Sequence, residues 1–162
     1  MISNRTVSGL GFLAAVLLLV GAVIFEYMLD LEPCPLCMIQ RILVAVVGVF
    51  FLLAWLHGPK RLGLYIYNGV VLVVAGMGVA VAGRHVWLQN LPEGQVPECG
   101  PGLEYLLSAF PLAKAVELIL SGSGECHEVA WSFLGLTIPG WTLIAFSLFM
   151  MAAVWQLTRT SE

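Results

Sequence analysis

Residues 32–41 read Glu32-Pro33-Cys34-Pro35-Leu36-Cys37-Met38-Ile39-Gln40-Arg41, and a long apolar run lies on either side of them. A disulfide between Cys34 and Cys37 would close a very small ring, which adds little stability because loop-closure stabilisation grows with loop length. The pair is therefore better explained as a reactive dithiol. Arg41 follows Cys37 by four residues, so the two share one face of a helix. A cation beside a sulfur favours the nucleophilic thiolate, and we expect Arg41 to tune the pair.

The composition is that of an integral membrane protein. Of the 162 residues, 60% are apolar and 10% are charged, whereas a soluble domain carries about 25% charged residues. The formal net charge is −3, and no basic cluster suits a nucleic acid. We therefore expect residues 1–162 to form a single domain embedded in the lipid bilayer. We expect no nucleic-acid partner. An arginine within a membrane helix is costly, which indicates a function for Arg41.

Four apolar segments are long enough to cross a bilayer. We expect an all-α, antiparallel bundle of four transmembrane helices with one short turn and one long loop. The helices cover about residues 9–28, 37–56, 64–88 and 139–158, the turn covers 57–63, and the loop covers 89–138. The first run is long for a secretory signal and no small-x-small cleavage site follows it, so we interpret it as a retained helix. The third helix carries Gly69, Gly76 and Gly83 at heptad spacing, which indicates a helix-packing face.

The charged residues predict the orientation of the bundle. Alternating helices place both termini and the 57–63 turn on one side, which holds Arg5, Lys60, Arg61 and Arg159. Positive residues favour the cytoplasmic side, so we expect cytoplasmic termini. The excess of positive residues on this side is small. It is larger if Arg41 and Arg84, on the opposite side, lie within helix ends and are not counted as loop residues. All four cysteines then face outward, which in a bacterium is the periplasm, where disulfides persist. We expect Glu26 and Asp30 to be solvated charges at that boundary.

The long loop divides into two parts. Residues 91–102 are rich in proline and glycine and contain Cys99, a composition typical of irregular structure. Between Leu112 and Leu120 the apolar residues lie on one helical face, which suits a short helix on the membrane surface. Cys126 follows shortly after this segment.

The loop cysteines, Cys99 and Cys126, are compatible with three functions. A structural disulfide between them would restrict the unfolded loop by roughly 3–4 kcal/mol in the chain-entropy model. If Cys99 and Cys126 lie near Cys34 and Cys37, the two pairs would instead exchange disulfides through a mixed-disulfide intermediate. The third function is a structural zinc site, but only the first pair has the usual knuckle spacing, so we expect no metal.

Electrons that reach Cys34 and Cys37 need an acceptor. The sequence contains no dinucleotide fingerprint or P-loop, whereas a quinone takes two electrons and is dissolved in the bilayer. Cys37 would be the donor thiolate, favoured by the positive end of the helix and by Arg41. His85, near the outer end of the third helix, could donate to a quinone carbonyl. A lone histidine at a helix end is more often an interfacial residue.

The segment Cys34–Arg41 resembles the Cys-x-x-Cys-x-x-Gln/Glu-Arg motif of the DsbB family of bacterial disulfide bond formation proteins. The resemblance covers nearly the whole chain and agrees with the number and order of the helices. It continues in three further segments: Pro97-Glu98-Cys99, Ser121-Gly122-Ser123-Gly124-Glu125-Cys126, and Trp131-Ser132-Phe133-Leu134-Gly135-Leu136-Thr137-Ile138-Pro139-Gly140-Trp141.

The resemblance implies an inner-membrane protein that reoxidises the periplasmic thiol oxidase DsbA and reduces ubiquinone or menaquinone. It implies two redox disulfides and two quinone-side residues, namely Cys34–Cys37, Cys99–Cys126, Arg41 and His85. Reduced DsbA would attack Cys99, and Cys126 would exchange with Cys34. Cys37 would then face the quinone, with Arg41 stabilising the charged species. The segment Leu112–Leu120 would be the membrane-lying loop helix of the family.

Three alternatives stay open at this stage. The chain could be a paralogue that serves a dedicated DsbA-like partner. It could be similar to vitamin K epoxide reductase, although there the membrane Cys-x-x-Cys typically follows the loop cysteines, whereas here it precedes them. It could also be a non-catalytic membrane protein with structural disulfides or a metal-handling role. A structural disulfide should resist mild reduction and leave no quinone signal.

Overall fold

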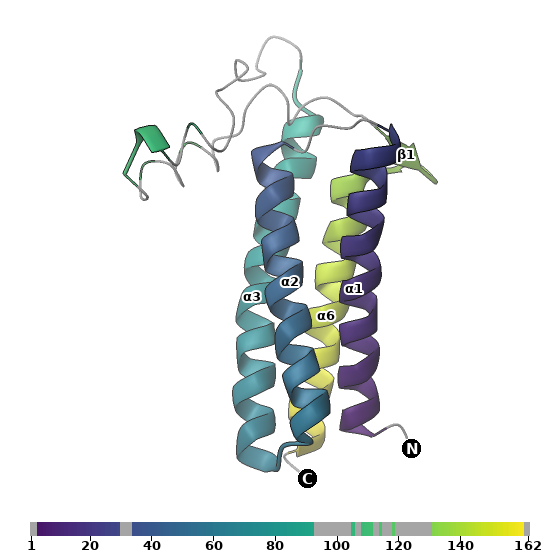
Figure 1. The fold of residues 1–162 in the computed structure, drawn as a ribbon, viewed down its shortest axis with the longest axis vertical. Coiled ribbons are helices and arrows are strands. Elements are labelled where there is room, and N and C mark those ends of the chain that lie inside the picture. Colours follow the sequence, from purple (N-terminus) through teal and green to yellow (C-terminus); the bar gives the residue numbers. More distant parts are fainter. Residues whose placement is uncertain are drawn as a thin grey trace.

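The computed structural model describes residues 3–29, 34–92 and 131–160, together with residues 105, 108–111, 114 and 118. Four long helices form the body of this part of the protein, and Figure 1 shows them side by side. They are α1 (Asn4–Leu29), α2 (Pro35–His57), α3 (Arg61–Gln89) and α6 (Ile138–Thr160). Each helix encloses the span expected from its apolar run, so the predicted all-α four-helix bundle is confirmed. The expected loop helix at Leu112–Leu120 and the cysteines Cys99 and Cys126 lie outside the described residues.

All four helices have the length and composition to cross a membrane. In the most apolar segment of each helix, between 17% and 33% of the residues are buried within the protein. Most of the side chains of these segments are therefore not buried. Large apolar residues are exposed along every helix, for example Leu17, Val49, Val73 and Leu148. Such a surface is stable only where lipid covers it, and the chain is a multi-pass membrane protein.

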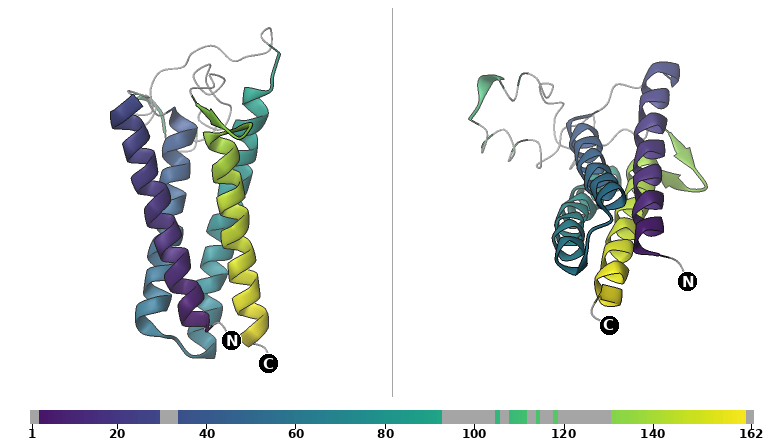
Figure 2. Two further views of the ribbon diagram at one scale, coloured as in Figure 1. Left: turned by 90° about the vertical axis from the view of Figure 1, so that its right-hand side faces the viewer. Right: turned by 60° about the horizontal axis from the view of Figure 1, so that its bottom comes forward.

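The bundle has two distinct ends. The first, which we call the terminal end, contains the start of α1, the α2–α3 turn and the end of α6 (Figure 1). At the other, the cysteine end, α2 begins and α3 finishes near a short strand pair (Figure 2). Helix α3 packs along both α2 and α6, and α1 packs along α2, whereas α1 contacts α6 only slightly. Large rings fill the common core, which includes Phe51 and Phe146.

Close approach of α3 and α6 depends on Gly78. A methyl group at this position would lie 2.4 Å from the Phe146 ring, so only glycine lets the ring pack against the α3 backbone. By contrast, open space lies beside Gly69, Gly76 and Gly83. The expected packing face at these three glycines is therefore wrong, because the crossing geometry turns them away from the neighbouring helices.

A two-stranded hairpin covers part of the cysteine end. Its strands, β1 (Ser132–Phe133) and β2 (Leu136–Thr137), are antiparallel, and Leu134 and Gly135 both have positive φ in the connecting turn, as two-residue hairpin turns require. Thr137 Oγ1 donates to Gln89 Oε1 of α3 at 2.7 Å. Trp131 lies against Phe25 of α1, with ring centroids 4.8 Å apart. The hairpin thereby joins the ends of α1, α3 and α6 and limits how far they can separate.

Candidate redox site

The Cys-Pro-x-Cys sequence builds the first turn of α2. Cys34 is the N-cap, in an extended conformation, and Pro35 is the first helical residue. Proline suits that position because its ring pre-sets φ and its missing N–H would have had no helical partner. The Cys34 sulfur accepts a hydrogen bond from the backbone N–H of Cys37 at 3.4 Å. A sulfur therefore occupies the place that a serine or aspartate oxygen usually fills at an N-cap.

The same turn brings the two sulfurs together, and no disulfide joins them. The Cys34 thiol donates to the Cys37 sulfur at 3.1 Å. Because a disulfide bond is about 2.05 Å long, the pair could be oxidised after a sulfur movement of roughly 1 Å. The predicted dithiol is thus assembled at the end of an apolar helix.

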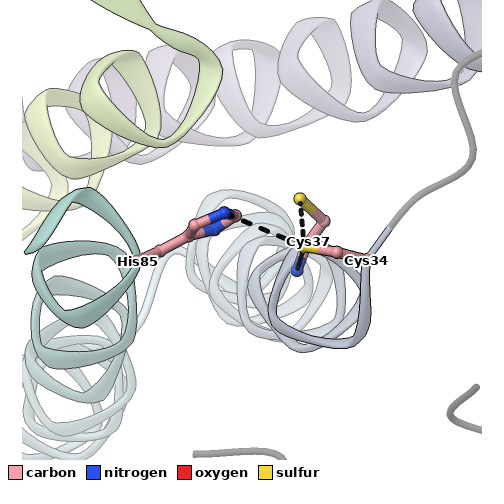
Figure 3. Close-up of side chains that lie close together, drawn as sticks. All are labelled: Cys34, Cys37 and His85. Carbon is pink, nitrogen blue, oxygen red and sulfur yellow. Dashed lines mark hydrogen bonds between the residues drawn. The ribbon is translucent and has the colours of Figure 1, made fainter. Parts of the chain in front are cut away.

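His85 extends this pair into a buried network. It comes from α3, is 2% exposed, and its Nε2 lies 3.8 Å from the Cys34 sulfur. Its Nδ1 lies 3.1 Å from Nε2 of Gln40, an amide N–H₂ group that can only donate. Nδ1 is therefore the acceptor, which assigns the ring proton to Nε2. Figure 3 shows the His85 ring directed at Cys34.

The side-chain donors in this network all point the same way, whereas the backbone N–H of Cys37 donates to the Cys34 sulfur. Gln40 donates to His85, His85 donates to Cys34, and Cys34 donates to Cys37. Successive hydrogen bonds polarise one another inside a low-dielectric interior. The partial positive charge at the N-terminus of α2 adds to this effect. Together they favour negative charge on the Cys37 sulfur, the position at which the sequence predicted the reactive thiolate.

The surroundings differentiate the two sulfurs. Apolar side chains of α2 and α3, among them Leu36, Val81 and Leu88, pack around Cys34. Cys34 is 6% exposed, whereas Cys37 is partly accessible. A reagent or electron acceptor from outside the bundle therefore meets Cys37 first.

Arg41 is directed toward α1. Its guanidinium forms an ion pair with Glu26 and donates to the backbone carbonyl of Ala22 at 3.2 Å. The side chains of Arg41 and Glu26 are 25% and 34% exposed. The expectation that Glu26 is a solvated charge is wrong, because Glu26 neutralises the arginine on the helix that carries the cysteines. Asp30 lies outside the described residues.

An apolar groove runs between α1 and α6, two helices that contact each other only slightly. It has a volume of about 350 Å³ and is lined by Ala14, Leu17, Leu18, Ala145, Leu148 and Phe149. Along α1, Leu18 lies one helical turn before Ala22, the residue whose carbonyl binds Arg41. On α1, the lining of the groove therefore ends one helical turn before the residue that binds Arg41.

In the sequence, Gln40 stands out only as a position of the Cys-x-x-Cys-x-x-Gln/Glu-Arg motif, and neither Gln40 nor Glu26 was predicted to have a role in the site. Gln40 is 4% exposed, and a buried polar residue one helical turn after Cys37 is a signal that spacing could have revealed. Glu26 is an acidic residue at the end of an apolar run, but its partner lies 15 positions later on another helix. Only the packing of α1 on α2 identifies that pair.

Comparison with known proteins assigns the family. The sequence profile described as "Disulfide bond formation protein DsbB" matches residues 4–156. A protein of Nitrosococcus oceani named "Disulfide bond formation protein B" is 51% identical over 98% of this chain and 94% of its own length. Proteins of the same name from Hahella chejuensis and Acinetobacter baumannii are 52% and 45% identical. They align over 95% and 98% of this chain and over 92% and 93% of their own lengths.

Proposed function

The chain belongs to the DsbB family of disulfide bond formation proteins, and we propose that it reoxidises a DsbA-type thiol oxidase of the periplasm and passes the electrons to membrane quinone. The observation that carries this proposal is the dithiol at the N-terminus of an apolar helix, with a line of hydrogen-bond donors directed at Cys37. Family membership supports a disulfide-forming redox role. The bundle of four apolar helices supports an acceptor dissolved in the bilayer.

The proposed route begins at the loop pair. A thiolate of the reduced partner attacks Cys99 of the Cys99–Cys126 disulfide, and the partner's second thiol then displaces Cys99. The partner leaves oxidised, and both loop cysteines are reduced. Each step exchanges one S–S bond for another through a mixed disulfide, so two electrons and two protons have moved from the partner to the loop.

The second exchange passes these electrons to the inner pair. Cys126 attacks Cys34 of the Cys34–Cys37 disulfide, and Cys37 leaves as a thiolate. The partial positive charge at the N-terminus of α2 stabilises that leaving group, and a better-stabilised thiolate leaves faster. Cys34 does not donate to it in this step, because its sulfur is bonded to Cys126. Cys99 then attacks Cys126, which restores the loop disulfide and releases Cys34 as a thiol. Because Cys34 is covered in the reduced structure, we expect the apolar side chains around it to shift when Cys126 attacks.

The residues of the bundle fit a quinone. The apolar groove between α1 and α6 suits an isoprenoid tail. Arg41, which binds α1 at Ala22, carries a positive charge that suits a reduced and negatively charged ring. When bound, quinone supplies a two-electron, two-proton sink that returns Cys34 and Cys37 to the disulfide. His85 holds a proton on Nε2 beside Cys34 and is the second candidate for the quinone side.

Quinone reduction by the purified protein tests this function. The protein in detergent, supplied with a reduced DsbA-type protein, should oxidise that partner and reduce an equal amount of a soluble ubiquinone or menaquinone analogue. Cys37→Ser should abolish quinone reduction and keep the helical circular dichroism, because the Cys34–Cys37 ring stabilises the fold little. Partner oxidation without quinone reduction, or unfolding of Cys37→Ser, would contradict the proposal.

The loop cysteines allow a matched experiment. Cys99→Ala should no longer form a mixed disulfide with the partner, but should still reduce quinone when a small dithiol reduces the inner pair directly. A mixed disulfide trapped through Cys126 would reverse the assigned order. Parallel assays with several DsbA-like proteins separate a general oxidase from a paralogue that serves one dedicated partner.

A further inference from the structure

We propose that the reduced site is also a binding site for a zinc-type divalent cation, held by Cys34, Cys37 and His85. The two sulfurs and a nitrogen of the His85 ring all lie within 4.8 Å of one another. Two cysteines and one histidine form a donor set that zinc uses in proteins, and a site with three protein ligands leaves one position open for water. The side chains come from α2 and α3, which pack along each other, so the donors are pre-assembled by the bundle.

The distances are close to those of a tetrahedral site. The sulfurs are 3.1 Å apart, and the Cys34 sulfur is 3.8 Å from His85 Nε2. With Zn–S bonds of about 2.3 Å and Zn–N bonds of about 2.0–2.1 Å, tetrahedral geometry requires roughly 3.8 Å between sulfurs and 3.6 Å between sulfur and nitrogen. Metal binding therefore needs each donor to move by less than about 1 Å. Side-chain rotation of the partly exposed Cys37 can supply most of that movement.

Gln40 makes the histidine able to serve as a ligand. In the structure, Gln40 donates to Nδ1 and the ring proton is on Nε2. A metal on Nε2 requires the proton to be on Nδ1, and ligating histidines usually donate that proton to an oxygen acceptor. Rotation of the Gln40 amide by half a turn places Oε1 where Nε2 now lies. One buried amide can thus support both the hydrogen-bonding and the metal-binding tautomer.

Charge balance also favours this occupant. Binding of Zn²⁺ converts two thiols to thiolates and releases two protons, while the histidine stays neutral. The resulting centre has no net charge, which matters because Leu36 and Leu88 surround it with apolar surface and an unpaired charge there would be costly. A monovalent cation would leave the two thiolates only partly compensated.

The oxidation state of the pair controls this site. A Cys34–Cys37 disulfide has no thiolate to offer, so the cation binds only after the pair has been reduced. Bound metal then occupies both sulfurs and prevents their oxidation. Metal binding itself stands on the geometry alone, whereas the resulting block of electron transfer rests on the proposed function.

Zinc titration of the inner pair tests the site directly. The full-length Cys99→Ala/Cys126→Ala variant removes the loop thiols, so that any thiolate-bound metal is on Cys34 and Cys37. After reduction in detergent, competition with a chromophoric chelator should detect one Zn²⁺ per chain, with release of two protons. Cd²⁺ in its place should give thiolate-to-metal charge-transfer absorption. Equal zinc binding by the oxidised variant, or no binding by the reduced one, would overturn the proposal.

Substitutions in the same background identify the ligands. His85→Ala and Gln40→Leu should each weaken zinc binding by roughly 10–100-fold, the range typical of lost ligand support. Gln40→Glu should keep or strengthen binding, since a carboxylate accepts the Nδ1 proton. His57→Ala is the matched control, because His57 lies at the terminal end beside Tyr67, and binding should not change. Unaltered binding in both His85→Ala and Gln40→Leu would exclude the histidine from the site.

The activity assay separates this inference from the proposed function. In the protein with all four cysteines, zinc should slow quinone reduction, and a chelator should restore the rate. A protein that binds zinc at the inner pair but never reduces quinone would keep the metal site and overturn the proposed function. A protein that binds zinc at the inner pair but reduces quinone at an unchanged rate with saturating zinc would overturn the inferred block of electron transfer.

Discussion

Glu26 acts on the cysteine end through a single neighbour, Arg41. The ion pair joins α1 to α2 one helical turn beyond Cys37, and the Ala22 carbonyl holds the same guanidinium. Both side chains are partly exposed, so the pair contributes about 0–1 kcal/mol to stability. Its larger effect is on position, because it fixes the direction in which the positive charge of Arg41 points.

We predict that Glu26→Gln raises the quinone KM several-fold with little change in kcat, because Arg41 loses its fixed orientation. Arg41→Ala should lower kcat/KM by a larger factor, since the charge itself is removed. Steady-state quinone reduction measures both. The double variant is the control: if Glu26 acts through Arg41, Glu26→Gln should add nothing to Arg41→Ala. Additive losses would instead give Glu26 an independent role.

Gln40 sets the proton position on His85 and, through it, the reactivity of the cysteines. We predict that Gln40→Leu slows alkylation of Cys37 by iodoacetamide several-fold at neutral pH, because the line of donors toward its sulfur loses its first member. The Cys99→Ala/Cys126→Ala background restricts alkylation to the inner pair, and mass spectrometry assigns the modified sulfur. Gln40→Leu should also lower the free energy of unfolding by about 1–3 kcal/mol, since it leaves the buried Nδ1 of His85 without its hydrogen-bond partner.

Gln40→Asn is the matched control for this alkylation experiment. It keeps the amide but shortens the side chain, so the amide cannot reach His85 without a shift of α2, and it should behave like Gln40→Leu. If both variants react as fast as the original protein, the Gln40–His85 contact does not control the sulfur.

At the scale of helices, Gly78 decides how closely α3 approaches α6. We predict that Gly78→Ala lowers the free energy of unfolding by about 1–3 kcal/mol, the usual cost of overpacking, because the added methyl meets the Phe146 ring. Thermal unfolding in detergent, followed by circular dichroism, measures the change. Gly76→Ala on the same helix is the control: open space lies beside it, and replacing a helical glycine with alanine typically stabilises by about 0.5–1 kcal/mol. Equal effects at both positions would contradict this account.

The helices themselves could be predicted from the sequence, but their contacts could not. An apolar run of sufficient length determines that a segment spans a membrane, and this property is local. Which faces touch depends on crossing angles and on the axial shift between helices. The heptad spacing of Gly69, Gly76 and Gly83 therefore suggested a contact that is absent between the described helices, whereas the close approach occurs at Gly78.

The same division holds for the candidate site. Cys34 and Cys37 could be found because their chemistry depends on spacing within one turn. His85 was a candidate by helix depth, but its contact with Cys34 spans 51 positions and needed the packing of α3 on α2. The roles of Gln40 and Glu26 could not be predicted, although Gln40 belongs to the motif, because each acts through a residue on another helix.

At the scale of the whole molecule, the arrangement of the helices fixes which residues share a side of the membrane. The start of α1, the end of α6 and the α2–α3 turn lie at the terminal end (Figure 1). The dithiol lies in the first turn of α2, at the cysteine end. Disulfide exchange with a periplasmic partner requires the cysteine end to face the periplasm. The small excess of positive residues at the terminal end favours the same orientation.

We predict that cysteines placed at the two ends react with opposite membrane faces. In a chain whose native cysteines are replaced, Asn90→Cys should be labelled by a membrane-impermeant maleimide in intact spheroplasts of the bacterial inner membrane. Lys60→Cys should be labelled only after the membrane is permeabilised. Both positions are exposed at helix ends, so a difference in labelling reports sidedness rather than burial. Labelling of Lys60→Cys alone in intact spheroplasts would invert the bundle, place the dithiol in the reducing cytoplasm, and exclude a periplasmic oxidase as its partner.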